Sequence, residues 1–287
     1  MLIELQIEQM FNFKKSQKNL LIVILTATFV ANVAILLVPS NDTKNLLGDI
    51  FRPIAAGSAV PFGLLIVYRQ KLHGLFGRAY LALLAGITCW FIAETIWGIY
   101  QFVLNVPVPT PSIADGLWLA GYGGYGYFMF SMARFYSRFK KSHLVIAGAA
   151  VAIFSAFYIN AIVSASDLTG PNGPIELAIT IAYPVLDGIL IVPAVLVVFN
   201  SRKGQLTAIP WIFIFWILTT VADSLYGYTV VVNIAGVLSV WNLVYVPAYL
   251  CMAAGMYWYN KFFIVDEKKL AELWKKASDG QAGKDMK

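Results

Sequence analysis

The chain has 287 residues, of which 59% are hydrophobic and only 13% are charged, and its mean hydropathy is +0.71. Soluble domains carry about 25% charged residues, so this composition excludes one. Apolar runs of about 20 residues, the length that an α-helix needs to cross a membrane, recur along the chain. Strands of outer-membrane barrels alternate polar and apolar residues, and these runs do not. We therefore predict an all-α integral membrane protein without a separate soluble domain.

The apolar runs predict eight transmembrane helices joined by short connections. They lie at about 19–38, 51–68, 79–104, 114–136, 143–164, 177–200, 207–232 and 238–260. The first follows a lysine-rich segment, 1–18, and resembles a signal sequence. It is longer than the apolar core of a typical signal peptide, and no small-residue cleavage site follows Val38, so we expect a retained signal anchor. The second is the least apolar, because Arg52, Pro53 and Gly57 interrupt it.

The distribution of basic residues predicts the orientation. Of the 21 lysines and arginines, all except Lys44 and Arg52 fall on one predicted side of the membrane. By the positive-inside rule that side is cytoplasmic. We therefore expect a multi-pass protein of the cell membrane with both termini in the cytoplasm. The net charge of +6 then reflects topology and contact with the anionic lipid bilayer, and it does not indicate nucleic acid as a partner.

The segment 261–287 predicts a cytoplasmic amphipathic helix followed by a disordered tail. Leu270, Leu273 and Trp274 share one helical face, and lysines occupy the rest. Such a helix lies on an anionic membrane surface or docks a partner. A simple positively charged anchor is the alternative.

An internal repeat relates the two halves of the predicted transmembrane domain, 19–260. IAETIWGIYQFVLN (92–105) aligns with VADSLYGYTVVVN (221–233), and ADGLWLAGY (114–122) aligns with WNLVYVPAY (241–249). The paired positions include Glu94 with Asp223, Trp97 with Tyr226, Asp115 with Asn242, Trp118 with Tyr245, and Tyr122 with Tyr249. The offset of about 130 residues covers four spans, so it predicts a 4+4 parallel repeat with halves at about 19–136 and 143–260. The alternative is that aromatic-rich membrane helices resemble one another.

Four acids lie within predicted spans: Glu94, Asp115, Asp187 and Asp223. A charge at the bilayer centre costs roughly 2.5–3.5 kcal/mol, so we expect these acids to face the bundle interior or a water-filled cavity, or to be protonated. The rise of 1.5 Å per residue places Asp187 near the midplane and the other three nearer the outer surface.

Helical spacing adds aromatic residues to the faces that carry these acids. One face carries Glu94 and Trp97, and the same spacing continues to Gln101 and Asn105. We predict an aromatic-walled, outward-facing cavity for a small cationic or amphipathic ligand, in which ring faces add roughly 0.5–2 kcal/mol by cation–π attraction. The predicted ligand-binding residues are Glu94, Asp223, Asp115, Asn242, Trp97, Tyr226, Trp118, Tyr122, Tyr245 and Tyr249. Asp187 and Tyr183, one turn apart, form a candidate ion or proton site.

The same residues have a purely structural interpretation. Tyrosine and tryptophan concentrate at membrane interfaces whatever the function. Tyrosine hydroxyls also bond to acids between helices and so hold a bundle together. Under this alternative the core is filled and no ligand binds.

Several chemistries have no support in the sequence. No predicted span contains a lysine for a retinal Schiff base, and the two histidines and two cysteines show no metal-ligand spacing. GYGGYG (121–126) fits a dinucleotide-binding pattern but lies inside a span, where no strand precedes it. We therefore expect no metal, no cofactor and no enzyme, although a lipid-modifying enzyme that uses carboxylates alone remains open.

Two stretches resemble a known class of membrane region. TPSIADGLWLAGYGGYGYF (110–128) and AYPVLDGILIVPAVLVV (182–198) are similar to the multi-span input regions of prokaryotic histidine kinases and diguanylate cyclases. The residues that carry the resemblance are Pro111, Ser112, Asp115, Trp118, Gly121, Tyr122, Tyr183, Pro184 and Asp187. The resemblance implies a sensor. No kinase, cyclase or PAS sequence follows, so we expect any output to pass through a signalling partner or the tail.

The leading interpretation is thus a membrane-embedded sensor or binding protein. The alternatives are a secondary transporter that uses Asp187, a lipid-modifying enzyme, and a structural subunit of a membrane complex.

Overall fold

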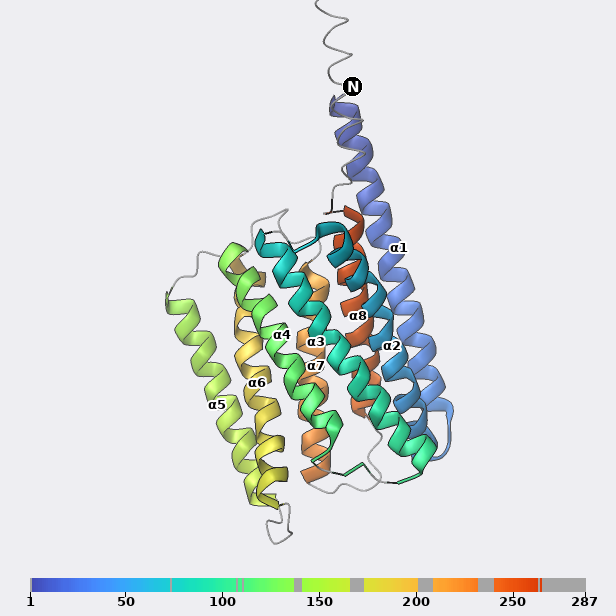
Figure 1. Cartoon of the computed structure of the whole chain (residues 1–287), viewed down its shortest axis with the longest axis vertical. Coiled ribbons are helices and arrows are strands. Elements are labelled where there is room, and N and C mark those ends of the chain that lie inside the picture. Colours follow the sequence, from blue (N-terminus) through green and yellow to red (C-terminus); the bar gives the residue numbers. More distant parts are fainter. Residues whose placement is uncertain are drawn as a thin grey trace, which may run out of the picture.

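The structure is a computed structural model that describes residues 2–72, 74–106, 108–109, 111–136, 141–165, 173–200, 209–231, 240–262 and 264. These ranges are helical throughout, apart from short connections. The elements in chain order are α1 (Leu2–Leu37), α2 (Asn41–Gln70), α3 (Gly74–Ile99), the π-helix η1 (Tyr100–Leu104), α4 (Ile113–Tyr136), α5 (Lys141–Ala165), α6 (Gly173–Asn200), α7 (Ile209–Val231) and α8 (Val240–Phe262). The helices run side by side as a bundle, with the N-terminal part of α1 extending beyond one end (Figure 1).

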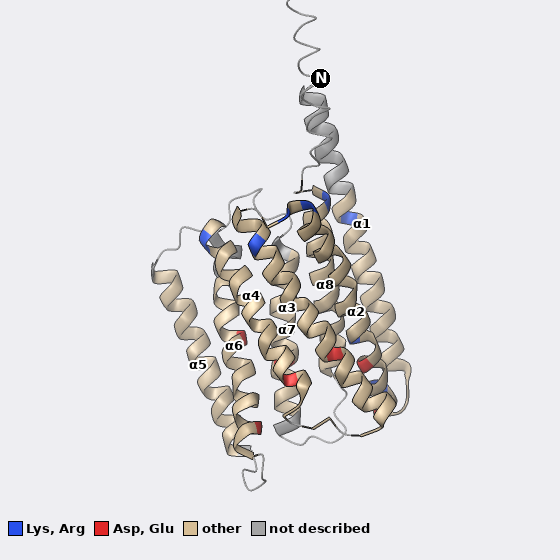
Figure 2. Cartoon of the chain, viewed as in Figure 1, with Lys and Arg blue, Asp and Glu red and all other residues tan. Residues whose placement is uncertain are grey.

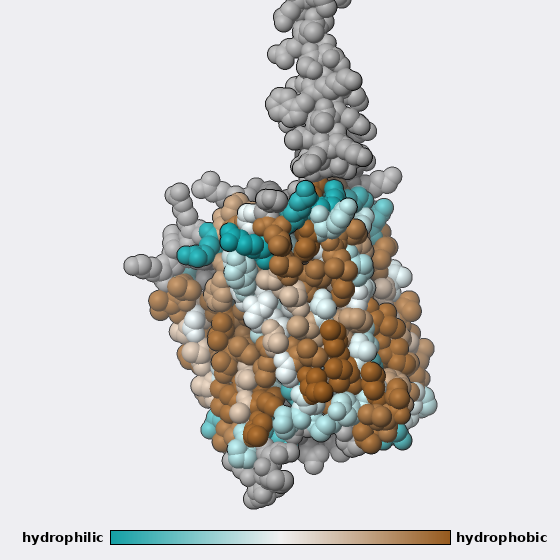
Figure 3. Space-filling view, in the orientation of Figure 1, coloured by the Kyte–Doolittle hydropathy of each residue, from teal (hydrophilic) through white to brown (hydrophobic). Residues whose placement is uncertain are grey.

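Seven of these helices are long and apolar enough to cross a membrane, as the predicted membrane class requires. α4 is not among them, because glycines and tyrosines lower its hydropathy. It nevertheless has 24 residues, or about 36 Å of helix, and lies alongside the others. Apolar side chains cover much of the middle of the visible surface (Figure 3).

Six helices form a closed ring. Around it, α2 packs against α3, α3 against α4, α4 against α6, α6 against α7, α7 against α8, and α8 against α2. The two remaining helices pack outside this ring: α1 lies against α2 and α8, and α5 lies against α6 and α7. The buried core therefore sits inside the ring, and α5 covers the seam between α6 and α7.

Two helices begin well before their predicted spans. α2 starts ten residues earlier than expected, at Asn41, because the Ser40 hydroxyl accepts a hydrogen bond from the Thr43 amide at the N-cap. The early start places Asp49 one turn before Arg52 in the same helix, where the two side chains pair. α1 begins at Leu2, ahead of the predicted span 19–38.

The third predicted span ends at Leu104 as expected, but its last five residues form the π-helix η1. Asn105 follows in the left-handed conformation, with φ of 50°. The wider π turn changes which residues share a face. The predicted tail, 261–287, lies outside the described residues from 265 onward.

Charge is distributed unequally along the bundle. Most lysines and arginines of the described chain gather at the end from which α1 extends, whereas the acids lie inside the bundle or toward the opposite end (Figure 2). This separation agrees with the basic-residue asymmetry found in the sequence.

Candidate ligand-binding cavity

A cavity of about 160 Å³ lies within the ring of six helices. Every helix of the ring contributes to its wall, and α5 contributes one residue, Tyr158. Nine of the ten predicted ligand-binding residues line it: Glu94, Trp97, Asp115, Trp118, Tyr122, Asp223, Tyr226, Tyr245 and Tyr249. The structure thus brings these side chains to one place, while their role in binding stays a prediction.

Asn242 is the predicted residue that lies elsewhere. It is 1% exposed, and its amide packs against Gly48 where α8 meets α2. Gly48 allows this close approach, because a Cβ there would overlap the Asn242 side chain. Asn242 therefore fills the α2–α8 interface and is not part of the cavity wall.

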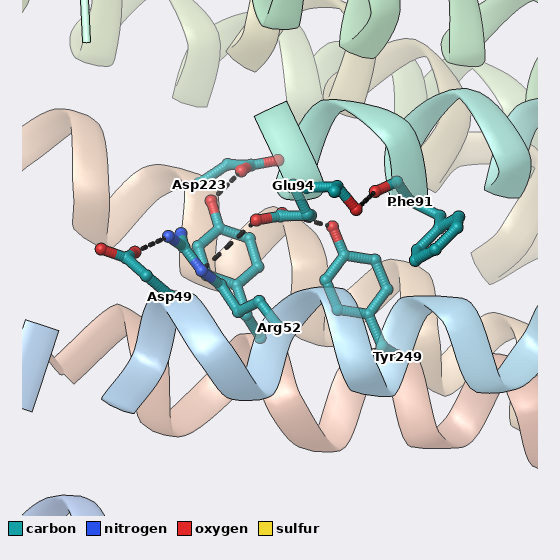
Figure 4. Close-up of polar contacts among 8 residues, drawn as sticks. Asp49, Arg52, Phe91, Glu94, Asp223 and Tyr249 are labelled. Atoms are coloured by element: carbon teal, nitrogen blue, oxygen red, sulfur yellow. Dashed lines mark hydrogen bonds and ion pairs between the residues drawn. The ribbon is translucent and has the colours of Figure 1, made fainter. Parts of the chain in front are cut away.

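Arg52 of α2 is the cation of the cavity, and it lies between two carboxylates (Figure 4). Its guanidinium donates a hydrogen bond to Asp49, and its Nε lies 3.4 Å from Oε2 of Glu94 on α3. It also lies 5.6 Å from the centre of the Tyr245 ring. Arginine cannot lose its charge in a protein. The two carboxylates therefore compensate a charge that is only 6% exposed.

Glu94 has one further partner besides Arg52. Tyr249 of α8 donates a hydrogen bond of 2.7 Å to Oε1 of Glu94. One turn earlier on α3, the Trp90 indole donates a hydrogen bond of 2.9 Å to the backbone oxygen of Trp118, which ties α3 to α4. Among the described residues Oε2 of Glu94 accepts no hydrogen bond, and its interaction is the ion pair with Arg52.

A second group of acids lies on the opposite side of the ring. Tyr245 donates a hydrogen bond to Asp223 of α7. Tyr122 of α4 lies between two carboxyl groups, 2.7 Å from Asp187 of α6 and 3.5 Å from Asp223. Asp187, predicted as a separate midplane site, is therefore connected to the cavity through the Tyr122 hydroxyl.

Asp115 lies in the first turn of α4 and connects this helix to α6. Its Oδ2 accepts hydrogen bonds from both the amide and the hydroxyl of Ser112, at 2.8 and 2.9 Å, and its own amide donates to the Ser112 hydroxyl at 3.4 Å. This reciprocal pair caps the start of the helix. Its Oδ1 accepts a hydrogen bond of 3.1 Å from the Tyr183 hydroxyl. Tyr183 therefore pairs with Asp115 across helices, and not with Asp187 one turn along α6.

Seven lining residues were not among the predicted site residues: Arg52, Trp90, Tyr158, Ile179, Thr180, Pro184 and Gly227. Three of them are charged or aromatic. Arg52 appeared as an interruption of the second span and as an exception to the basic-residue asymmetry, and nothing in its spacing related it to Glu94. Trp90 lies one turn before Glu94, so extending the helical spacing backward would have included it. Tyr158 had no such signal, because the face it occupies on α5 carries no charged residue.

The wall has the chemistry of a site for a small cation or zwitterion. Three carboxyl groups and one guanidinium line it together with nine aromatic side chains. Electrostatic attraction is stronger in such a buried site than in water, and ring faces add cation–π attraction. Within the described part of the chain, no group of three histidine, cysteine, aspartate or glutamate residues is close enough to hold a metal ion.

Comparison with protein-family models, curated proteins and solved structures found no match to this chain.

Proposed function

We propose that this chain is a membrane-embedded binding protein for a small ligand that carries a positively charged group, and that binding serves sensing. The observation that supports this most is a cavity in which three carboxyl groups outnumber one guanidinium. The acids of both halves converge there, although they come from helices far apart in the sequence. A signal would pass to a membrane or cytoplasmic partner.

The pairing of charges around the cavity leaves some of its carboxylates without a compensating cation, so a cationic ligand can interact with them. Arg52 compensates Asp49 and Glu94, so those three side chains together carry one net negative charge when ionised. Asp115 and Asp223 have neutral partners, namely hydroxyl and amide groups. A ligand cation near Asp223 would interact with the Tyr226 and Tyr245 rings as well as with the carboxylate.

In the same proposal the chain crosses the cell membrane eight times, as two parallel four-helix halves with cytoplasmic termini. Two reciprocal contacts support the repeat. Tyr249 of the second half bonds Glu94 of the first, and its counterpart Tyr122 of the first half contacts Asp223 of the second. Likewise α8 packs against α2 as α4 packs against α6. α1 and α5 depart from this symmetry, since α1 lies on α2 and α8 whereas α5 lies on α6 and α7.

The experiment compares choline with its uncharged isostere, neohexyl alcohol, by thermal shift of the purified protein in detergent. Choline should raise the melting temperature, and neohexyl alcohol should not. Glu94→Gln and Asp223→Asn should each weaken choline binding about tenfold, because a hydrogen-bonded or paired charge is lost. Glu176→Gln is the matched control, because Glu176 is exposed at the start of α6 and does not line the cavity.

Equal shifts with the charged and neutral compounds would contradict the proposal. So would unchanged choline binding in both Glu94→Gln and Asp223→Asn. In that case the acids and tyrosines act as structural contacts between helices, as the alternative interpretation states.

Transport is the second candidate, favoured by the chain of contacts from the cavity to Asp187. The Tyr122 hydroxyl links Asp187 to Asp223. A proton or cation bound at one carboxyl group would therefore change the affinity of the other carboxyl group for a proton or cation. Uptake of radiolabelled choline into proteoliposomes that Asp187→Asn abolishes would support transport. Binding without uptake would leave sensing as the function.

A further inference from the structure

One side chain of α5 reaches the cavity from outside the ring. Tyr158 lines the cavity wall, and its hydroxyl donates a hydrogen bond of 3.1 Å to the backbone oxygen of Ser224 on α7. The hydroxyl rests against Gly227, where a Cβ would overlap it. The ring of six helices is therefore not closed by its own side chains at the α6–α7 seam, and Tyr158 completes the wall.

An apolar groove lies next to this seam on the outer surface. It has a volume of about 550 Å³ and lies between α5, α6 and α7. Val151, Gly188, Ile191 and Leu225 line it, and so does Ser224, whose backbone oxygen accepts the hydrogen bond from Tyr158. Phe154 and Val221 are 54% and 45% exposed, so the groove is open to the surface that faces lipid.

The groove and the cavity share a boundary. Pro184 of α6 lines both of them. Phe154, in the groove, stacks on Tyr158, in the cavity wall, with ring centres 6.1 Å apart and planes inclined by 17°. On α7 the cavity residues Asp223 and Gly227 alternate with the groove residues Ser224 and Tyr228.

The volumes indicate how one ligand would divide between the two spaces. Sites for drug-sized ligands have about 300–1,000 Å³. The cavity alone, at about 160 Å³, is smaller than this range, whereas the adjoining groove supplies a further 550 Å³ or so. The polar cavity suits a compact charged group, and the apolar groove suits a hydrocarbon chain.

We propose that the ligand is a single-chain amphiphile with a cationic head, that its head occupies the cavity and its chain the α5–α6–α7 groove, and that it enters from the bilayer past Tyr158. The inference rests on the proposed function, since it assigns the class of ligand and the route of entry for the same cavity. The occupant of the groove is the chain of this ligand, because the groove adjoins the charged cavity at Pro184, which lines both, and at Tyr158, which stacks on the groove residue Phe154.

The test is photolabelling of the full chain in lipid nanodiscs. The probe is dodecyltrimethylammonium with a diazirine in the middle of its chain, and the control is the same chain on an uncharged maltoside head. We expect the cationic probe to label groove residues such as Val151, Ile191 and Leu225. Asp223→Asn should lower that labelling about tenfold through loss of the charge that holds the head. Excess choline should also lower labelling by the cationic probe. Labelling by the maltoside probe should change neither with Asp223→Asn nor with excess choline.

The proposed role of Tyr158 at the entry to the cavity is tested with two variants of adjacent α5 residues. Tyr158→Ala removes the side chain that completes the wall and its hydrogen bond, so the cationic probe should label the groove about fivefold faster. Phe157→Ala is the control, because Phe157 is 74% exposed and lines neither the groove nor the cavity. The labelling rate of this variant should match that of the unmodified chain.

The outcomes separate this inference from the function on which it rests. If choline raises the melting temperature but both probes label the groove equally, the cavity binds cations, the groove holds ordinary bilayer lipid only, and lateral entry is wrong. If choline does not bind and groove labelling is independent of the head, both proposals are wrong. Equal labelling rates for Tyr158→Ala and Phe157→Ala would overturn the role of Tyr158.

Discussion

Nε of Arg52 lies 3.4 Å from Oε2 of Glu94, and this ion pair joins α2 to α3 inside the bundle. Both side chains are almost fully buried, at 6% and 3% exposed. Asp49 pairs with the same guanidinium from one turn away on α2. A buried charge is tolerated only when it is paired, so the three side chains depend on one another.

The first prediction concerns this triad. Arg52→Met should lower the free energy of unfolding by about 3–5 kcal/mol, because it leaves two buried carboxylates without their cation. The measurement is unfolding of the detergent-solubilised protein by denaturant. The triple variant Arg52→Met, Glu94→Gln, Asp49→Asn should recover most of the loss, since no buried charge remains. If the Arg52→Met variant is as stable as the unmodified protein, water already solvates the two carboxylates.

The triad also illustrates the limits of sequence reasoning at this site. Helical spacing and the repeat grouped Glu94, Trp97 and their counterparts, because each lies at a fixed interval within one helix. No such rule relates Arg52 to Glu94, since their pairing depends on how α2 packs against α3. Arg52 was therefore assigned to the outer surface, and its compensation of Glu94 and Asp49 was missed.

Local backbone geometry explains two other differences. The spacing from Glu94 predicted that Gln101 and Asn105 would share its face, but the π turn at Tyr100–Leu104 changes the interval, and neither residue lines the cavity. Asn242 aligns with Asp115, yet the small Gly48 beside it lets α2 approach and bury it. The helical class, by contrast, followed directly from long apolar runs, because the bilayer allows few other structures.

The second prediction compares two glycines of α4. Gly121→Ala should lower stability by about 1–3 kcal/mol, because the added methyl group would overlap the Trp90 indole and disturb its hydrogen bond to Trp118. Gly123→Ala should be neutral or slightly stabilising, because its Cβ would meet nothing within 4 Å. Thermal unfolding of both variants in the same detergent makes the comparison. Equal melting temperatures would mean that α3 and α4 are farther apart than described.

The third prediction tests the repeat through its paired tyrosines. Tyr249→Phe removes the hydrogen bond to Glu94, and Tyr122→Phe removes those to Asp187 and Asp223. Each variant should lose about 1–3 kcal/mol of stability, the usual effect of leaving a buried acceptor without its donor. Tyr127→Phe, on the exposed side of α4, serves as the control and should change little. A large loss in one variant with none in its counterpart would argue against equivalent halves.

The fourth prediction concerns orientation. Lys71 follows α2 at the basic end of the bundle, and Asn41 begins α2 at the other end; both are exposed. In a background with Cys89 and Cys251 replaced by alanine, a membrane-impermeant maleimide added to whole cells should label Asn41→Cys and spare Lys71→Cys, because the positive-inside rule predicts that the basic side faces the cytoplasm. Permeabilised cells should label both. The reverse pattern in whole cells would place the acidic cavity nearer the cytoplasm, and a ligand from outside would then need another route.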